Sequence, residues 1–395
     1  MNNKKYIMLR SRTKKIDDHV LYRIKAVRSF GDVKEGDIGG WIESEGNLSH
    51  DGKCWIYNSA CVYGYASVYQ DATISNRARV YDDAIVSNKA QIYDDAKVYG
   101  LAKVRGSAIV RDNAEVYDSA AVYGTATISD NAQVYNYAEV YDEVKMNDDS
   151  RVCDYAQVYG KVEMNDDSSV GDRAKVYGNV VMSDDASVYG NAKVYDNVEL
   201  CGQANIFEDA EVFENADVSG CVEVRGQAKV YGCTELYNNV VVAKHAEVYG
   251  DTKLDDCVTV SGYSIVRGYS RISGNVKITD NAIVEGATID NAAIIGCNAH
   301  IERMRDFACV QGFGTECRLT TFYRQADGTI GVTCGCFNGT IDTFEKTVIE
   351  RREGKVAEEY LQIINLMKYH FGITKKLKTK ISLLNRIKLL LKRNK

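Results

Sequence analysis

Small and branched apolar residues recur every six positions from Cys54 to Val284 without a break. In 39 consecutive hexads the first position is Ala, Val, Ser, Thr or Cys, and the third is Val, Ile, Leu or Met. An amphipathic helix requires apolar residues about 3.6 positions apart, and a flat strand requires strict alternation, so a period of six fits neither. The pattern predicts short strands joined by tight corners, which is the hexapeptide-repeat form of parallel β-helix.

The fifth and sixth positions of the hexads are rich in Gly, Asn and Asp. These residues tolerate the left-handed backbone conformation that a tight corner requires. Each hexad is therefore predicted to form one strand and one corner, and three hexads to close one coil. The register slips by one residue after Val284 and the repeat ends near Ile301. This length predicts an all-β solenoid of about 14 coils.

Aromatic residues at the outward fourth position recur in every third hexad on two of the three predicted sides. The eight-ring column consists of Tyr123, Tyr141, Tyr159, Tyr177, Tyr195, Phe213, Tyr231 and Tyr249. The five-ring column consists of Tyr63, Tyr81, Tyr99, Tyr117 and Tyr135. Rows of amphipathic rings are typical of interfaces, so we expect self-association or a protein partner at these tyrosine faces. Alternatively, the rings are only exterior ladders on the strand surface.

Both flanks of the repeat are suited to cover the open ends of a solenoid, where unpaired strand edges would otherwise recruit other chains. The predicted organisation is an N-terminal β cap over residues 1–53, the β-helix over 54–301, a small α+β module over 302–371, and a basic amphipathic tail over 372–395.

In the cap, residues 20–30 indicate a strand, and the only two tryptophans, Trp41 and Trp55, are predicted to plug the open core. In the module, a hairpin is expected to turn at Asp327 and Gly328.

Two helices are expected after the hairpin. The first is predicted to begin near Thr340 or Asp342 and to end near Gly354. The second presents an apolar side formed by Ala357, Tyr360, Leu361, Ile364 and Met367.

The composition of the 395 residues indicates a globular protein, since 45% are hydrophobic and 26% are charged. The first residues lack the apolar stretch of a signal peptide, and no run of 18 apolar residues could span a bilayer, so a cytoplasmic location is expected. No two of the 12 cysteines are separated by three hexads, so none lie directly above one another on neighbouring coils. They are predicted to be reduced thiols.

Charge is unevenly distributed along the chain. The repeat from Cys54 to Ile301 contains 37 acidic and 20 basic residues, whereas residues 360–395 contain ten Lys or Arg and no acid. The tail could bind a membrane surface or nucleic acid, or it could form a helix that packs against the acidic solenoid. Mimicry of DNA by the acidic coils is a further alternative.

Two stretches of the chain resemble known proteins. Residues 39–57 carry the words Gly39 Gly40 Trp41, Asn47 Leu48 Ser49, Gly52 and Cys54 Trp55 Ile56 Tyr57. They resemble the start of the YdcK-like family of hexapeptide-repeat proteins. This resemblance implies a left-handed β-helix of the trimeric acyltransferase superfamily and, by likeness, an acetyl-CoA-dependent acyltransferase. Residues 320–371 resemble a small terminal domain of uncharacterised phage-encoded proteins, which implies a phage or prophage origin.

Enzymes of that superfamily generally use a His as the base that activates a hydroxyl or amine, beside a loop extruded from one coil. No insertion interrupts the 39 hexads, and only His245 and His300 lie within the repeat. His245, at a corner beside Lys244, is the candidate catalytic base under this alternative; otherwise it is a tolerated corner residue. His300 is expected at the surface.

A column of carboxylates is predicted at one corner, since Asp112, Asp130, Asp148, Asp166 and Asp184 recur at 18-residue spacing. Stacked acids repel one another, so either their pKa values rise or a cation lies along the column. Ca²⁺ held by Asp148, Asp166 and Asp184 is one alternative, and ordinary solvent-exposed corner chemistry is the other.

The sequence thus predicts a non-catalytic cytoplasmic β-helix scaffold or binding protein, with no cofactor expected. The alternative is a hexapeptide-repeat acyltransferase that uses acetyl-CoA and an unknown acceptor.

Overall fold

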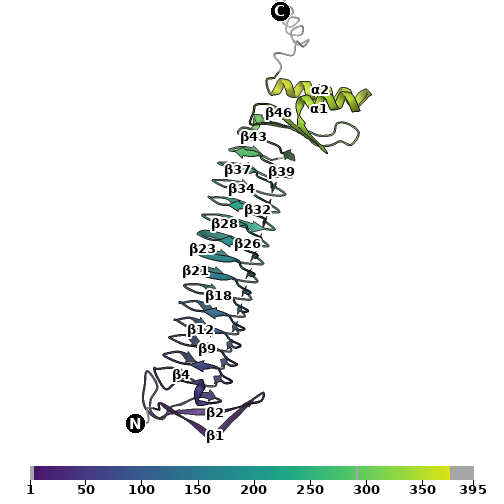
Figure 1. Cartoon of the computed structure of the whole chain (residues 1–395). Coiled ribbons are helices and arrows are strands. Elements are labelled where there is room, and N and C mark those ends of the chain that lie inside the picture. Colours follow the sequence, from purple (N-terminus) through teal and green to yellow (C-terminus); the bar gives the residue numbers. More distant parts are fainter. Residues whose placement is uncertain (1–3, 291, 374–395) are drawn as a thin grey trace, which may run out of the picture. The chain divides into compact units, whose positions relative to one another are not determined.

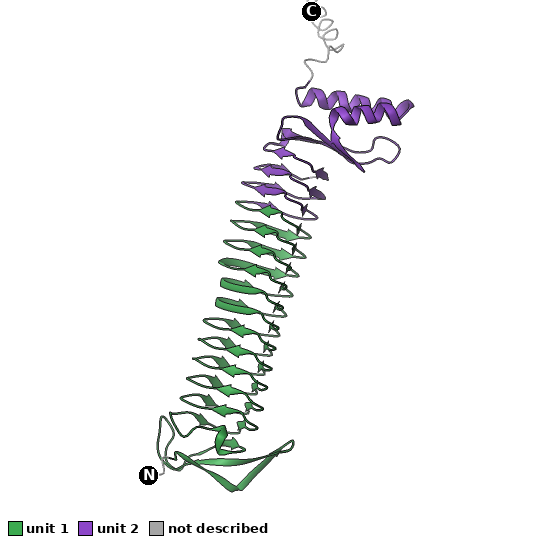
Figure 2. Ribbon diagram, viewed as in Figure 1, with its two compact units in different colours: residues 1–251 green, residues 252–395 purple. Residues whose placement is uncertain are grey.

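The computed structural model describes residues 4–290 and 292–373, so the predicted basic tail lies outside the described residues from residue 374 onward. The chain divides into two compact units, residues 1–251 and residues 252–395 (Figure 2). Parallel β-solenoid coils occur in both units, with about 14 turns of about 18 residues in total. The predicted fold class is therefore confirmed.

The coils of unit 1 each contain three short strands that pair in parallel with the strands of neighbouring coils (Figure 1). Paired residues are 18 positions apart, as in Val62 opposite Val80 and Val158 opposite Val176. We name the three sides of unit 1 by their outward fourth-position residues: the five-ring side, the eight-ring side and the polar side.

The strands of the five-ring side are β5 (Cys61–Val62), β8 (Arg79–Val80), β11 (Lys97–Val98), β14 (Glu115–Val116), β17 (Gln133–Val134), β20 (Arg151–Val152), β22 (Ser169–Val170), β24 (Ser187–Val188), β27 (Asn205–Ile206), β30 (Glu223–Val224) and β33 (Val241–Val242). Those of the eight-ring side are β6 (Ser67–Val68), β9 (Ile85–Val86), β12 (Lys103–Val104), β15 (Ala121–Val122), β18 (Glu139–Val140), the first halves of β21 (Gln157–Met164) and β23 (Lys175–Met182), β25 (Lys193–Val194), β28 (Glu211–Val212), β31 (Lys229–Val230) and β34 (Glu247–Val248). The polar side contains β4 (Trp55–Ile56), β7 (Thr73–Ile74), β10 (Gln91–Ile92), β13 (Ile109–Val110), β16 (Thr127–Ile128), β19 (Lys145–Met146), the second halves of β21 and β23, β26 (Asn197–Gly202), β29 (Asp217–Gly220) and β32 (Glu235–Asn238).

The core of the coils is made of the first and third hexad positions, as the sequence predicts. Ala120 and Val122 are both fully buried, and the same two positions are buried from coil to coil. The small first residue leaves room at the corner where the chain turns, and the branched third residue fills the interior at native packing density.

The fifth hexad position provides the left-handed corner. Gly64, Asp82 and Asn88 have φ values of 65°, 57° and 60°. Glycine suits several of these corners for a second reason, because a Cβ on Gly124 would lie 2.6 Å from the backbone nitrogen of Asp142 on the next coil.

The N-terminal cap is a β-structure that joins the first coil. Strand β1 (Tyr6–Ile16) pairs antiparallel with β2 (His19–Ala26), which pairs with β3 (Ile38–Ile42). Strand β3 then pairs in parallel with β5. A short 3₁₀ helix, η1 (Glu45–Asn47), follows β3 along the chain. The sequence indicates β2 but gives no sign of β1.

The two tryptophans have different positions. Trp55 is 1% exposed and packs against Phe30, with ring centroids 5.4 Å apart. Trp41 is only half-buried and lies in an outer cluster beneath the guanidinium of Arg23, 4.9 Å from its ring centroid. The prediction that Trp41 plugs the core is therefore wrong, because its place in β3 directs it to the outer face. In the same strand, the backbone of Gly39 packs closely against the buried ring of Trp55, since a Cβ on Gly39 would lie 2.5 Å from that ring.

Unit 2 begins with further coils, formed by β35 (Lys253–Leu254), β36 (Thr259–Val260), β37 (Ile265–Arg267), β38 (Arg271–Ile272), β39 (Val276–Ile278), β40 (Ile283–Glu285), β41 (Thr288–Ile289), β42 (Ala293–Ile295) and β43 (His300–Ile301). The predicted register slip is present, since Ile289 pairs with Ile272 and this interval is one position shorter than the regular coil.

The C-terminal module of unit 2 is a four-stranded antiparallel sheet packed against two helices. It contains η2 (Met304–Asp306), β44 (Phe307–Val310), β45 (Thr320–Arg324), β46 (Ile330–Cys334), β47 (Phe337–Thr340), α1 (Ile341–Arg351) and α2 (Gly354–His370). The predicted hairpin is confirmed as β45 and β46, and Thr340 caps α1 through a hydrogen bond from the Thr343 amide. The outer strands β44 and β47 were not predicted.

Candidate functional site

The eight-ring column is a continuous stack of aromatic side chains along unit 1. Neighbouring ring centroids are 4.7–5.0 Å apart, and neighbouring planes are within 7° of parallel. The guanidinium of Arg105 covers the first ring, 4.7 Å from the centroid of Tyr123. The stack follows from the register, because in-register parallel strands place identical hexad positions one strand spacing apart.

Stacking determines which parts of these rings remain accessible. Each ring of the column is half-buried, because its faces contact the rings above and below while an edge remains outside. Burial raises the pKa of Tyr141 and of Tyr195 to about 12. Hydroxyl groups are held by carboxylates of the next coil, as where Tyr231 donates to Glu247 at 3.2 Å. The result is a flat strip with an apolar body and a polar edge.

The five-ring column has the same geometry, with centroids 4.8–5.1 Å apart. Its first ring is covered by the N-terminal hairpin. Tyr63 is 5% exposed, lies 5.0 Å from the His19 ring, and belongs to a cluster with Leu21 and Cys61. One end of this column is therefore already occupied by the protein's own cap.

A third, shorter stack was missed by the sequence analysis. Tyr137 and Tyr155 lie at the sixth hexad position, with centroids 5.0 Å apart and exposures of 57% and 58%. Their 18-residue spacing is visible in the sequence, where it is the signal that predicts such a stack.

The aspartate column forms a ladder of hydrogen bonds to the backbone. The Asp166 amide donates to Asp148 Oδ2 at 3.3 Å, and the Asp184 amide donates to Asp166 Oδ2 at 3.2 Å. Each carboxylate thus satisfies the N–H group of the left-handed corner one coil further along. In the part of the chain that the structure describes, no group of three or more His, Cys, Asp or Glu residues has metal-site geometry. A cation along Asp148, Asp166 and Asp184 stays a prediction.

The two histidines of the repeat lie apart from one another in the sequence and in different units. His245 is exposed at a corner, next to Lys244, which adopts a φ of 64°. His300 is half-buried in β43, with Nε2 3.5 Å from Glu302 Oε1. The role of His245 as a catalytic base stays a prediction.

All twelve cysteines, which lie within the described residues, are free thiols. Among the residues that the structure describes, no helix combines the length and apolar character needed to cross a membrane.

No family model matches this chain. A stretch of 50 residues is 42% identical to the protein of Escherichia coli (strain K12) named "Uncharacterized acetyltransferase YdcK". The match covers 12% of this chain and 15% of YdcK. Together with the observed solenoid, it supports the resemblance to hexapeptide-repeat β-helix proteins. The resemblance of residues 320–371 to phage-encoded proteins stays a prediction.

Proposed function

We propose that this protein is a non-catalytic β-helix scaffold that self-associates through the eight-ring column. The observation that carries the proposal is the continuous stack itself, with half-buried rings in register over eight coils. Tyrosine edges of this kind combine apolar area with hydroxyl groups, which is the composition enriched at interface cores.

The stack also lowers the entropic cost of association. Ordering a mobile side chain at an interface costs about 0.5–1.5 kcal/mol. The rings of the column are already held by their neighbours at 4.7–5.0 Å, so a second copy of the chain would find them ordered. The five-ring column is the weaker candidate, because the hairpin covers its first ring.

Light scattering on a size-exclusion column tests this proposal. We expect the full chain to be an oligomer, with a mass at least twice its monomer mass of 43.9 kDa. The double variant Tyr159→Arg/Tyr177→Arg places like charges on adjacent coils of the strip and should yield monomers. The matched control is Asn165→Arg/Ser183→Arg, which makes the same change at the fourth position of the polar side and should leave the mass unchanged.

Two outcomes would contradict the proposal. A monomeric unmodified protein at micromolar concentration would remove self-association altogether. An oligomer that persists in the tyrosine variant would place the interface elsewhere. Circular dichroism of both variants checks that the solenoid remains folded.

The similarity to YdcK favours a second candidate, an acyltransferase that uses acetyl-CoA with His245 as the base. His245 is exposed at its corner and therefore accessible to a bound substrate. Turnover of acetyl-CoA that is lost in His245→Ala and retained in His300→Ala would support this candidate. A chain that neither binds nor consumes acetyl-CoA would exclude it.

The cellular setting belongs to the same proposal. A cytoplasmic location and a phage or prophage origin remain predictions from the N-terminal composition and from the resemblance of residues 320–371. Cell fractionation and the genomic neighbourhood of the gene test them separately.

A further inference from the structure

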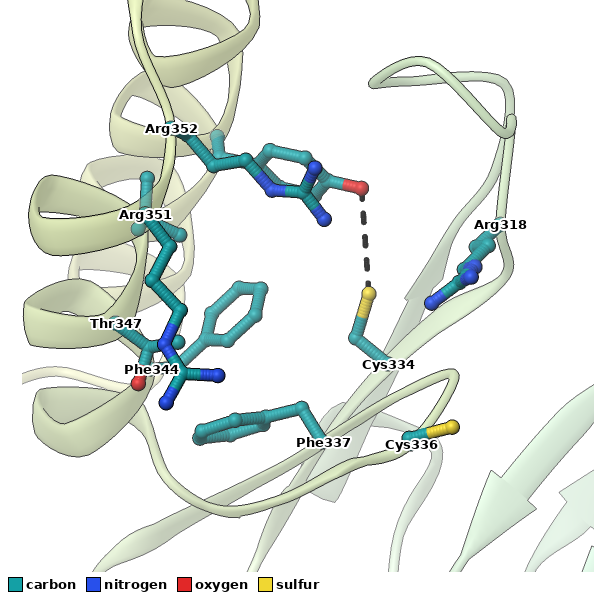
Figure 3. Close-up of a pocket in the computed structure, with 10 residues that line it drawn as sticks. Arg318, Cys334, Cys336, Phe337, Phe344, Thr347, Arg351 and Arg352 are labelled. Carbon is teal, nitrogen blue, oxygen red and sulfur yellow. Dashed lines mark hydrogen bonds between the residues drawn. The ribbon is translucent and has the colours of Figure 1, made fainter.

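The C-terminal module contains a pocket of about 250 Å³ between the end of α1, the start of α2 and the sheet. Figure 3 shows Arg351 and Arg352 on one side of it and Arg318 on the other, with their guanidinium ends directed toward the space between. The remaining lining residues are Cys334, Cys336, Phe337, Phe344, Thr347, Val348 and Tyr360.

Positive charge is concentrated at this pocket. Its lining includes three arginines and no carboxylate, although residues 302–373 contain ten acidic and nine basic side chains. Arg318 pairs with Glu316, which lies outside the lining. Within residues 4–290 and 292–373, Arg351 and Arg352 have no carboxylate at ion-pair distance, so their donors are available to a ligand.

Aromatic rings form a further part of the pocket lining. Phe337 and Phe344 have centroids 4.9 Å apart, and Phe344 meets Tyr360 edge to face at 5.8 Å. Phe344 is 4% exposed and Tyr360 is 7% exposed, so these rings are fixed in the core of the module. Such a lining binds the face or edge of a further aromatic ring.

The arginines are also held in place by backbone geometry. Gly335 has a φ of 59°, and a Cβ there would lie 2.5 Å from Nη1 of Arg318, so the absence of a side chain allows this arginine to lie across the turn. Arg352 caps α1 by donating its amide to the Val348 carbonyl. Its side chain therefore starts from a fixed point at the rim of the pocket.

We propose that this pocket binds a phosphate monoester of an aromatic ring, with the ring against Phe337 and Phe344 and the phosphate between the three arginines. Guanidinium groups form paired hydrogen bonds with phosphate oxygens, and a dianion with three oxygens matches several guanidiniums better than a carboxylate does. The volume is below the roughly 300–1,000 Å³ of pockets for drug-sized ligands, which favours a single ring. The ester could be a free small molecule or a phosphotyrosine side chain. This inference is independent of the proposed scaffold function.

Calorimetric titration of the full chain with phenyl phosphate tests the proposal. Phenyl phosphate should bind at least about tenfold more tightly than inorganic phosphate, which has no ring, or benzoate, whose carboxylate carries one charge and two oxygens. Arg351→Gln/Arg352→Gln should weaken phenyl phosphate binding by about tenfold or more. The control Lys346→Gln removes an exposed charge from the same helix outside the pocket and should leave binding unchanged.

The variant Phe337→Leu tests the contribution of the aromatic ring to binding separately from that of the phosphate group. It should weaken phenyl phosphate while leaving inorganic phosphate unaffected. A phosphotyrosine peptide that binds more tightly than phenyl phosphate would identify a protein side chain as the source, and a weaker one would identify a free ester. Equal affinity for benzoate and phenyl phosphate, no binding of phenyl phosphate, or full binding by the double arginine variant would overturn the proposal.

Discussion

The Lys5 side chain ends inside the first coil, with Nζ 2.8 Å from the backbone carbonyl oxygen of Cys54. Lys5 is fully buried, and its Nζ also lies 3.1 Å from Cys54 Sγ and 3.4 Å from the Asp51 carbonyl oxygen. At the end of a solenoid, backbone carbonyl groups have no neighbouring strand whose N–H groups could donate hydrogen bonds to them. Lys5 supplies the missing donors, so a single ammonium group substitutes for a strand edge.

Replacing this lysine should destabilise the N-terminal end of the solenoid. In Lys5→Met the apolar stem is kept, but the Cys54 and Asp51 carbonyls lose their donor. Leaving buried acceptors unpaired costs about 1–3 kcal/mol, and we expect a loss of that size in the free energy of unfolding. Urea unfolding at pH 7 measures it. A matched variant on the exposed face of β1, Lys15→Met, should change stability by much less.

The difference in unfolding free energy between wild type and Lys5→Met should depend on pH. Burial lowers the pKa of Lys5 from its ordinary value of 10.5, so the unfolded state binds the proton more tightly than the folded state. Stability contributed by Lys5 therefore rises with pH toward 10.5. The difference between wild type and Lys5→Met should therefore grow as the pH approaches 10.5, and should be larger at pH 10 than at pH 7. A constant difference would contradict burial as the cause.

The tyrosine columns should make the fold sensitive to alkali. Burial raises the pKa of Tyr81, Tyr141 and Tyr195 to about 12, whereas the ordinary value is 10.0. The stability from these groups is complete below pH 10, because both states are then protonated. It is lost as the pH rises from about 10 to about 12, since only the unfolded state releases its protons easily.

Urea midpoints measured between pH 8 and pH 11.5 test this expectation. The midpoint should stay level at first and fall above about pH 10. In Tyr81→Phe/Tyr141→Phe/Tyr195→Phe, which keeps the stacked rings and removes three titrating hydroxyls, the fall should be shallower. An equal fall in both proteins would show that other groups govern the alkaline response.

Substitutions in the aspartate column distinguish the contribution of hydrogen bonding to stability from that of charge. Asp166→Asn keeps an oxygen that can accept the Asp184 amide, as Asn88 Oδ1 accepts the Gly106 amide at 3.3 Å elsewhere in the solenoid. It should leave stability unchanged or raise it at low salt, whereas Asp166→Ala should cost about 1 kcal/mol. Calcium titration of both proteins tests the cation alternative. A rise in midpoint seen only in the wild type would support bound Ca²⁺, and equal responses would contradict it.

The solenoid could be predicted from the sequence because one local rule is repeated in every hexad. A small first residue and a branched third residue fix the inside, and the coil length follows from the 18-residue spacing of Tyr123 and Tyr141. Strand β1 could not be predicted in this way. Its pairing with β2 is set by an antiparallel hairpin in which exposed and buried positions alternate only weakly. Lys5, which directly precedes β1, is a charged residue in a buried place and could not be predicted there either.

The C-terminal pocket shows why sites are harder to predict than the fold. Arg318 and Arg352 are 34 positions apart and lie in different connections, before β45 and between α1 and α2, so no spacing in the sequence brings them together. Only the packing of α1 on the sheet does so. The aromatic columns, by contrast, were predicted residue by residue, because in-register strands convert a sequence interval directly into a distance.

Two buried serines offer a final test of the hexad rule. Ser150 and Ser168 occupy first positions on adjacent coils, where they are fully buried, and neither Oγ has a hydrogen-bond partner among the described residues. Ser264, also a buried first-position serine, donates to the Ser261 carbonyl at 2.8 Å. An unpaired buried hydroxyl costs more than an apolar group of similar size. Ser150→Ala and Ser168→Ala should therefore each raise the free energy of unfolding by about 1 kcal/mol.

Ser264→Ala provides the matched control, because the same atom is removed from a hydroxyl that has a partner. We expect this variant to be unchanged or up to about 1 kcal/mol less stable, so the sign separates the two environments. Urea unfolding of the three single variants measures the difference. If Ser150→Ala and Ser168→Ala lost stability as Ser264→Ala does, their hydroxyl groups would have to be hydrogen-bonded inside the coil. The hexad would then require a polar partner at those corners rather than merely tolerate a small residue.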